Sequence, residues 1–402
     1  MQSLHDVHAA LNSIQQYVSK LIVEGECVPE LENTLVSRIR VGKESKDVLE
    51  ACHSYWRDYV SALHAELQNG ERKREEGDGS DIVDPQLLGN FLTRSLAAEN
   101  SIEIKGIRAA SVGNSKATFI LQLSPNKVLP DEVVLRMDQS FNFLGTKVSD
   151  EYPVLEVLYR NGVPTPKPLL LETTGGVLGK PFMLCSKEEG VVIGSIYDPP
   201  PRNDRILASI AGSLAKIHTV PVNQLASVNG LLNEENNICN EIDRYQSIWE
   251  GLGVVNPLLD TAFSWLNSHV QDAHGNHSIV HNDYNYHNIL IDDSRVSAVL
   301  DWEMTYLGNP AADLAYFHYG AERGAGFAYF LKSYEAAGGV LPKSKEMDFY
   351  IIWAHTRFAV MIYQMIDGVK RGEIKGLRFL KSCVHTFPKP MLSMAEKLSE
   401  LL

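Results

Sequence analysis

The stretch that most constrains the fold of this 402-residue chain runs from residue 279 to residue 317. It opens with a His-Asn-Asp triplet at 281–283, which is followed by four residues and then by Asn288. Two short apolar runs come next, separated by a polar Asp-Asp-Ser turn and ended by Asp301. The runs are 289–291 and 296–300. Two short strands joined by a tight turn would return Asp301 to the side of Asn288.

The residue types in this stretch suit phosphoryl transfer. The spacing matches the kinase catalytic loop H-R-D-x-x-x-x-N, in which the Asp accepts the hydroxyl proton and the Asn holds Mg²⁺. Asp301 stands where kinases place a second metal-binding Asp, and Mg²⁺ prefers oxygen ligands of this kind. A pair of buried strands with acidic turns would explain any one of these residues, but not their joint order and spacing. We therefore expect Asp283 to be catalytic, and Asn288 and Asp301 to bind Mg²⁺.

The same stretch resembles the aminoglycoside phosphotransferase family of kinase-like enzymes. Its members typically read H-G-D-x-x-x-x-N, then hydrophobic-D-W-E, then G-D-P-x-x-D-L-A. The wording V-L-D-W-E-M and L-G-N-P-A-A-D-L-A-Y-F is closest to the branch related to the kinase domain of acyl-CoA dehydrogenase family members 10 and 11. Asn282 replaces the usual Gly and Asn309 the usual Asp. Neither change removes an expected metal ligand or base, but the first places a side chain beside the acceptor site.

The resemblance covers roughly three quarters of the chain and implies an α+β, bilobal protein-kinase-like fold. A mixed α/β nucleotide lobe is expected over 85–185, and a mostly helical lobe with the catalytic loop and acceptor site over 186–402. Amphipathic periodicity predicts an extra N-terminal helical region over 1–68. The charged, Gly-rich segment 69–84 is typical of a linker. The apolar stripes of the N-terminal helices suit either packing against the main body or a homodimer face.

The first lobe is expected to supply the nucleotide contacts. Its strand-like runs are 102–110, 117–123 and 132–137. The third contains Arg136, the cation expected at the phosphates, where kinases normally carry Lys; Arg grips phosphate bidentately and keeps its charge. Glu151, in preference to Glu156, is its expected partner. A small-residue loop between the first two runs would cover the phosphates; taken alone it fits an ordinary hairpin turn better, and its position relative to the later motif favours the phosphate role. The further nucleotide-binding candidates are Ser111, Gly113, Asn114, Ser115, Cys185 and Lys187.

Six more side chains near the catalytic stretch have expected roles. His281 should fix the loop by hydrogen bonding, and Asp313 should cap a helix and hold the loop from behind. A long helix predicted over 346–371 contains Arg357, which suits either an anionic acceptor or a structural salt bridge. The acceptor-site candidates are Asn282, His287, Glu303 and Arg357.

Composition excludes several other classes of protein. The net charge of −13 argues against nucleic-acid binding. No apolar run approaches the roughly 20 residues that span a bilayer, and residues 1–6 show no secretory pattern. The five cysteines have neither zinc spacing nor a disulfide framework. We therefore expect a cytoplasmic protein with no membrane or nucleic-acid partner.

The expected reaction moves the γ-phosphoryl group of ATP to a hydroxyl of a small molecule, with Mg²⁺ as the metal; the sequence does not separate ATP from GTP. A hydroxyacyl-CoA or hydroxy acid is one acceptor hypothesis, from the D-W-E wording, and an aminoglycoside or macrolide antibiotic is the other. A cationic drug requires acidic surroundings and a CoA ester basic ones. The hypothesis from another class is a non-catalytic nucleotide-binding regulator, against which the intact Asp283, Asn288 and Asp301 argue.

Overall fold

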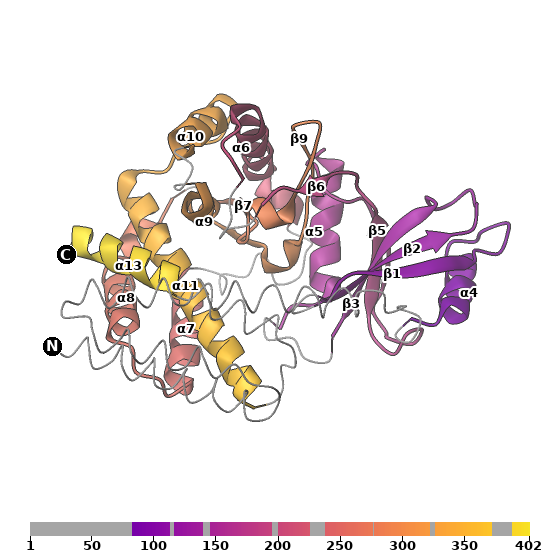
Figure 1. The fold of residues 1–402 in the computed structure, drawn as a ribbon, viewed down its shortest axis with the longest axis horizontal. Coiled ribbons are helices and arrows are strands. Elements are labelled where there is room, and N and C mark those ends of the chain that lie inside the picture. Colours follow the sequence, from indigo (N-terminus) through magenta and orange to yellow (C-terminus); the bar gives the residue numbers. More distant parts are fainter. Residues whose placement is uncertain are drawn as a thin grey trace, which may run out of the picture.

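The computed structural model describes most of the chain as two lobes, one built on a sheet and one mostly helical, with helix α5 between them (Figure 1). The described residues are 83–112, 116–139, 145–194, 200–225, 238–275, 277–321, 326–371 and 388–402. The N-terminal helices predicted over 1–68, the linker up to residue 82 and any dimer face on those helices lie outside this set.

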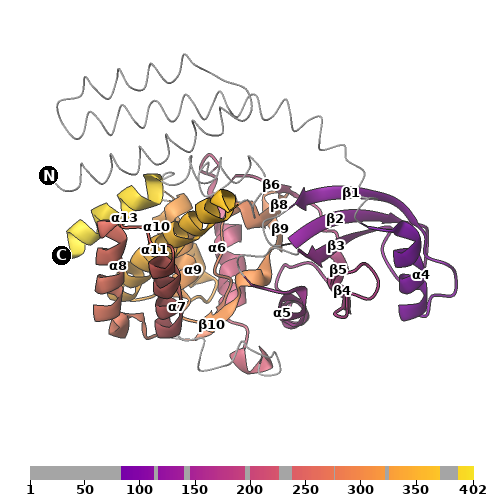
Figure 2. The same cartoon turned by 90° about the horizontal axis from the view of Figure 1, so that it is seen from below.

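Five antiparallel strands form the sheet of the small lobe, in the order β1-β2-β3-β5-β4. The strands are β1 (Ile104–Val112), β2 (Lys116–Leu123), β3 (Glu132–Asp138), β4 (Pro168–Glu172) and β5 (Phe182–Ser186). Helix α4 (Pro85–Ser95) packs on one face, and α5 (Val148–Arg160) lies on the side of the large lobe (Figure 2). The three strands predicted over 102–137 are therefore confirmed within two residues at each end.

Alternation along β2 and β3 separates the core of this lobe from its functional face. Leu135 and Met137 are buried with residues of α4, as are Phe119 and Leu121 of β2. Arg136 lies between two of these core residues, so its side chain leaves the sheet on the opposite face. A strand that looked almost wholly apolar in sequence thus presents its one cation away from the hydrophobic core.

The large lobe contributes the remaining elements. Its helices are α6 (Asp204–His218), α7 (Ile238–Gly251), α8 (Pro257–Ser268), α9 (Ala311–Ala321), α10 (Phe327–Ala336), α11 (Ser344–Lys370) and α13 (Pro388–Leu401). Its strands are β6 (Val191–Val192), β7 (Ser278–Val280), β8 (Ile289–Asp292), β9 (Arg295–Val299) and β10 (Tyr306–Gly308). Short 3-10 turns are η2 (Val222–Leu225), η4 (Val270–Ala273), η5 (Tyr286–Asn288) and η6 (Trp302–Met304). Among the described helices, none combines the length and the apolarity that crossing a membrane requires.

The predicted hairpin forms from β8 and β9. Its two-residue turn, Asp293 and Ser294, has φ values of +41° and +63°. Positive φ at both central positions matches the right-handed twist of the flanking strands, and Asp is among the residues that tolerate it. At the open end, the Leu300 N–H donates to the Asn288 carbonyl at 2.8 Å. Asp301, the next residue, therefore stands beside Asn288 as the sequence predicted.

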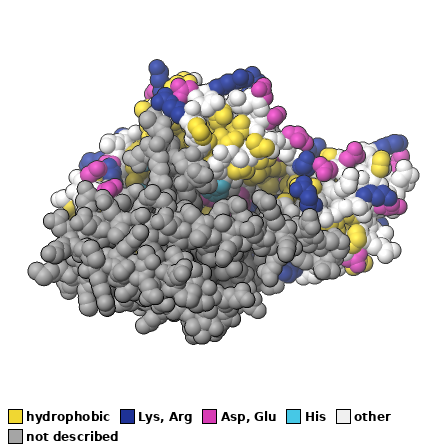
Figure 3. Space-filling view, viewed as in Figure 1, with side chains coloured by type: hydrophobic (Ala, Val, Ile, Leu, Met, Phe, Trp, Pro, Cys, Tyr) yellow, Lys and Arg dark blue, Asp and Glu magenta, His cyan; other side chains and the backbone are white. Residues whose placement is uncertain are grey.

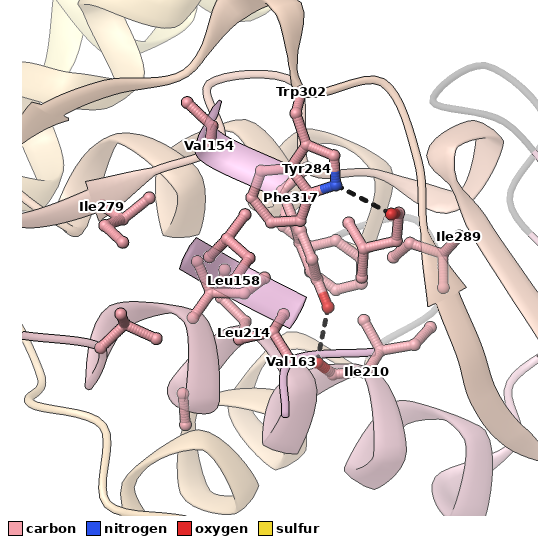
Figure 4. Close-up of a cluster of buried hydrophobic side chains, with 14 of the residues drawn as sticks. Val154, Leu158, Val163, Ile210, Leu214, Ile279, Tyr284, Ile289, Trp302 and Phe317 are labelled. Atoms are coloured by element: carbon pink, nitrogen blue, oxygen red, sulfur yellow. Dashed lines mark hydrogen bonds between the residues drawn. The ribbon is translucent and has the colours of Figure 1, made fainter. Parts of the chain in front are cut away.

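A hydrophobic cluster beneath the catalytic loop joins α5 to the large lobe. Trp302 donates its indole N–H to the Val299 carbonyl at 2.9 Å, and the Tyr284 hydroxyl donates to the Ile210 carbonyl at 2.8 Å (Figure 4). Val154 and Leu158 of α5 lie in the same cluster. The Trp302 indole and the Tyr284 hydroxyl are both hydrogen-bonded, so their side chains have defined positions beneath the loop and support it. The division of lobes at residue 185 stays a prediction.

Candidate active site

The catalytic loop is held in place by His281, which is completely buried. One imidazole nitrogen, Nε2, lies 2.9 Å from the Leu300 carbonyl, and Nδ1 accepts the Asp283 N–H at 3.2 Å. These two contacts fix the orientation of the buried ring within the loop. Its position matches the loop-fixing role expected from sequence.

Asp313 supports the same loop from α9. Its Oδ2 accepts the His281 N–H at 2.8 Å, and its Oδ1 accepts the Asn282 N–H at 2.7 Å. Nε2 of His218 lies 3.1 Å from Oδ2. We expected Asp313 also to cap α9, but Asn309 does so instead, since its side chain accepts the Ala311 N–H at 2.9 Å. Asp313 is therefore free to bind two backbone donors of the loop.

Asp283, Asn288 and His287 meet at the end of this loop. The Asn288 amide nitrogen donates to the Asp283 carboxylate at 2.8 Å and to the Asp283 carbonyl at 3.0 Å. His287 Nε2 lies 3.3 Å from the same carboxylate oxygen, Oδ2. The Asp283 side chain is 23% exposed, so an incoming molecule can reach it. Figure 3 shows histidine and acidic atoms that lie deeper than the hydrophobic surface beside them.

The surroundings keep Asp283 ionised. Burial alone would raise the pKa of its carboxyl, but the charge and hydrogen bond of His287, with a hydrogen bond from Tyr316, lower that pKa to about 2. Burial opposes the charged form of His287, yet the Asp283 carboxylate outweighs it and raises the pKa of the imidazole. At neutral pH the carboxylate can therefore accept a hydrogen bond from an alcohol.

Asp301 and Arg136 form an ion pair across the lobes. Arg136 Nη2 lies 2.8 Å from Asp301 Oδ1 and 3.2 Å from Glu151 Oε2. The other Glu151 oxygen accepts the Trp302 N–H at 3.3 Å. Asp301 itself has φ +65°, in the left-handed region that few residues other than glycine adopt. Arg136 therefore contacts both Glu151 of α5 and Asp301, the predicted metal ligand.

Burial shapes the electrostatics of this trio. Desolvation raises the pKa of Glu151 to about 7, although the Arg136 charge opposes the rise. Desolvation disfavours the charged form of Arg136 as well, but the carboxylates of Glu151 and Asp301 raise its pKa. Arg136 Nε is buried without a hydrogen-bond partner. A guanidinium with an unpaired inward donor suits an additional anionic ligand such as phosphate.

Arg357 of α11 binds the loop at Asn282, the residue that departs from the family pattern. Its Nη1 donates to the Asn282 side-chain oxygen, and its Nη2 donates to the Asn282 carbonyl at 2.6 Å. Asn282 has φ +69°, and its amide nitrogen donates to the Met304 carbonyl at 3.2 Å. Arg357 is 4% exposed and its Nε has no hydrogen-bond partner. It is therefore a buried neighbour of the loop, with one donor left for another group.

Two residues that the sequence reasoning missed bind Glu303. Lys116 Nζ lies 3.3 Å from Glu303 Oε2, and the Thr146 hydroxyl donates to the same oxygen at 2.9 Å. The acceptor-site role of Glu303 stays a prediction, but these partners belong to the nucleotide lobe. The available signal was a lysine placed directly after the small-residue loop, at the start of an otherwise apolar strand. Tyr316, which bonds to Asp283, was also missed.

The structure places the other nucleotide-site candidates as follows. Gly113, Asn114 and Ser115 lie outside the described residues, and Ser111 is described only as backbone at the end of β1. Burial raises the pKa of Cys185 to about 12, which keeps it a thiol. Lys187 Nζ lies 2.9 Å from Glu132 and 3.3 Å from Glu189. Cys185 is the fourth residue of β5, and Lys187 directly follows the end of that strand.

The oxygen atoms near Asp301 determine which metal would fit. Within the described residues, no three His, Cys, Asp or Glu side chains group as a metal site. The Asn288 side chain donates through its amide nitrogen to Asp283, so its amide oxygen is the atom that could ligate a metal, and the Asp301 side chain is 35% exposed. One carboxylate and one amide oxygen suit Mg²⁺ when phosphate oxygens and water complete its shell. The residues fit an ion that arrives with a nucleotide.

Comparison of sequences relates the chain to known phosphotransferases. Residues 106–350 match the model of the phosphotransferase enzyme family, APH. Acyl-CoA dehydrogenase family member 11 of Rattus norvegicus is 27% identical over 216 residues, covering 51% of this chain and 26% of that protein. The probable acyl-CoA dehydrogenase IBR3 of Arabidopsis thaliana is 30% identical over 229 residues, covering 52% and 27%. The chain thus spans about a quarter of the length of these relatives.

Comparison of structures gives the same fold. A putative aminoglycoside phosphotransferase of Ralstonia eutropha JMP134 superposes with a TM-score of 0.62 at 22% identity, covering 78% of this chain and 98% of that chain. Macrolide 2'-phosphotransferase type I gives 0.54 at 18% identity, covering 76% and 96%. A thermostable APH(4)-Ia mutant, in a ternary complex with AMP-PNP and hygromycin B, gives 0.52 at 17%, covering 77% and 98%. The predicted bilobal kinase-like fold is confirmed.

Proposed function

The chain belongs to the phosphotransferase enzyme family and is a small-molecule kinase, and from that premise we propose how its residues perform the transfer. The γ-phosphoryl group of ATP passes to an alcohol hydroxyl held by Asp283. The observation that supports this most is the contact of Asp283 with Asn288 at 2.8 Å, next to Asp301 on the same hairpin. Asp283, which would face the acceptor, therefore lies beside Asn288 and Asp301, which would face the metal.

Asp283 orients the acceptor hydroxyl by accepting its hydrogen bond. A carboxylate with a pKa of about 2 is a weak base, so it takes the proton late, as the oxygen becomes bonded to phosphorus. This timing suits a loose transition state, in which little negative charge builds up on the attacking oxygen. Asn288 and His287 hold the carboxylate in position during the step. Orientation, more than basicity, is the contribution of this residue.

Arg136 binds the nucleotide phosphates and Glu151 positions it. Asn288 and Asp301 would hold Mg²⁺, which would neutralise charge on the phosphates. Without a ligand, Arg136 and Asp301 neutralise one another at 2.8 Å. A phosphate would take the place of Asp301 beside Arg136, and Mg²⁺ would take the place of Arg136 beside Asp301, so neither side chain would be left unpaired in a partly buried site. His281 and Asp313 hold the loop, and Cys185 and Lys187 border the adenine end.

We assign the acceptor to the hydroxy acids, including their CoA thioesters. Buried polar atoms without partners border the loop at Arg357 Nε and the Tyr306 hydroxyl. Arg357 also lies with its guanidinium carbon 5.8 Å from the ring of Tyr316, the residue that bonds to Asp283. A carboxylate or thioester carbonyl would supply the missing acceptor for Arg357, whereas a cationic drug would be repelled. The names of the curated relatives point to acyl-CoA as well.

The test is an ADP-release assay with ATP and Mg²⁺ across an acceptor panel. The panel contains hydroxyacyl-CoA thioesters, the free hydroxy acids, hygromycin B and a macrolide. We expect turnover with the first two groups. Asp283→Asn should lower kcat by at least about 10²-fold, because the hydroxyl loses its charged acceptor, and should leave AMP-PNP binding within about two-fold by calorimetry.

The matched control is Asp293→Asn, which makes the same change at an exposed turn of the β8–β9 hairpin. It should retain full turnover. Full activity of Asp283→Asn would refute the assignment of the base. Turnover with the antibiotics alone would refute the acceptor class in favour of an antibiotic kinase. Nucleotide binding with no turnover on any acceptor would favour a non-catalytic regulator.

A further inference from the structure

Lys116, the first residue of β2, is a buried cation that the mechanism above does not use. Its side chain is 2% exposed. Nζ donates to the Thr146 carbonyl at 2.8 Å, to the Thr146 hydroxyl at 3.1 Å and to Glu303 Oε2 at 3.3 Å. These three acceptors match the three N–H groups of an ammonium ion. The lysine therefore has no donor left for a nucleotide phosphate, and any role must act through its partners.

Those partners come from segments that adjoin the nucleotide site. Thr146 lies just before α5, the helix that carries Glu151, and its hydroxyl donates to Glu303 at 2.9 Å. Asp138 ends β3, two residues after Arg136; its Oδ1 lies 3.6 Å from Lys116 Nζ and accepts the Val148 N–H at 3.1 Å. Glu303 lies two residues after Asp301. One ammonium group thus ties three segments of the small lobe to the turn that holds the predicted metal ligand.

Strand geometry explains why Lys116 and Arg136 act on the same turn. Lys116 pairs with Asp138, and Thr118 pairs with Arg136, on neighbouring antiparallel strands. Residues two apart on a strand share a face, so Lys116 and Arg136 leave the sheet on the same side. Arg136 reaches Asp301 and Lys116 reaches Glu303. Two ion pairs therefore run side by side from the sheet to one turn, where they end on residues two positions apart, Asp301 and Glu303.

Removing a charge from water is costly, so a buried lysine requires strong compensation from its partners. We propose that Lys116 is a positioning residue, which binds Glu303 and thereby holds the turn that carries Asp301 in place beside Arg136 for a Mg²⁺–nucleotide complex. Asp301, two residues before Glu303, has a left-handed backbone with φ +65°, a conformation that persists only where neighbouring contacts support it. The inference rests on the proposed function, because it concerns where the metal-bound nucleotide sits.

The experiment measures how strongly Mg²⁺ enhances AMP-PNP binding, by calorimetry, in the full chain. This readout needs neither turnover nor an acceptor. In Lys116→Met we expect the Mg²⁺ concentration for half-maximal enhancement to rise about 10-fold, since Asp301 is no longer held. AMP-PNP affinity in EDTA should change less than two-fold. Lys127→Met is the matched control: this exposed lysine pairs with Glu99 at 3.0 Å, and its variant should bind like the wild type.

A double variant distinguishes a positioning role of Lys116 from an effect on the stability of the fold alone. Lys116→Met with Glu303→Met removes both buried charges, which should restore thermal stability toward that of the wild type. The Mg²⁺ requirement should stay raised, because the tie to the turn is still absent. If the double variant recovered a wild-type Mg²⁺ requirement, Lys116 would merely neutralise Glu303 and the proposal would fail. A wild-type protein that binds AMP-PNP without any Mg²⁺ enhancement would instead refute the proposed metal site.

Discussion

At the scale of a single residue, burial strongly changes the pKa of Glu151. It is 2% exposed, faces Arg136 at 3.2 Å and still has a pKa raised to about 7 by desolvation. A carboxyl whose pKa is higher in the folded than in the unfolded chain binds a proton on folding. Its contribution to stability is therefore fully present below the unfolded pKa of 4.5 and is lost as the pH rises through about 7.

This predicts a pH-dependent difference between the wild type and Glu151→Gln. The glutamine does not titrate, so the free energy of unfolding of the wild type relative to the variant should fall by up to about 3 kcal/mol between pH 5 and pH 8. Urea denaturation at four pH values across that range would measure it. A difference that stays constant with pH would show that the buried carboxyl is ionised throughout.

Residue identities at the site were largely readable from sequence, because each one stands in a short motif of fixed spacing. Asp283, Asn288 and Asp301 lie within 19 residues of one another, and one hairpin brings them together. Lys116 and Glu303 could not be paired in the same way. They are 187 residues apart, and only the packed lobes bring them into contact. Arg357 was singled out by its charge, but its contact with Asn282 needed the fold.

At the scale of elements, α9 is the support on which the catalytic loop rests. Its first turn carries Asp313, which accepts two consecutive backbone N–H groups of the loop while being completely buried. Sequence predicted the long helix α11 and the β8–β9 hairpin because both depend on local periodicity and turn residues. It misplaced the cap of α9, since Asn309 and Asp313 are both capable caps and local pattern alone cannot rank them.

We predict that Asp313→Asn loosens this support. The amide can accept only one of the two backbone donors well, so a buried N–H group loses its partner and stability should fall by about 2–4 kcal/mol. Turnover should drop about 10–100-fold as the loop loses its position. Chemical denaturation and the ADP-release assay measure the two effects. Asp243→Asn, on the exposed side of α7, should change stability by less than about 0.5 kcal/mol; an equal loss in both variants would contradict the supporting role.

At the scale of the whole molecule, the two lobes share a charged seam. Arg136 contacts Asp301 and Lys116 contacts Glu303, so the turn of the large lobe that carries the proposed metal ligand is held by the sheet of the small one. The hydrophobic cluster around Trp302 adds α5 to the same junction. A ligand at the seam contacts both lobes and should stabilise them together.

We therefore expect AMP-PNP with Mg²⁺ to stabilise the wild type by about 2.7 kcal/mol at a ligand concentration 100 times its Kd. Chelation with EDTA should remove most of that gain. In Asp301→Asn the gain should already be small and indifferent to EDTA, because a metal ligand is missing. Thermal unfolding under the three conditions measures this, with Asp292→Asn, an exposed residue at the end of β8, as the control. A full Mg²⁺-dependent gain in Asp301→Asn would remove that residue from the metal site.

Arg136 and Asp301 are far apart in the sequence, so they are synthesised at different times. Arg136 leaves the ribosome 165 residues ahead of Asp301, a delay of roughly 10–30 s at ordinary rates of synthesis. During that interval the nascent small lobe can form its hairpins, but its cations have no carboxylates from the turn to meet. The apolar face of α5 that packs on the large lobe is uncovered over the same interval, and exposed apolar surface of this kind is what chaperones shield.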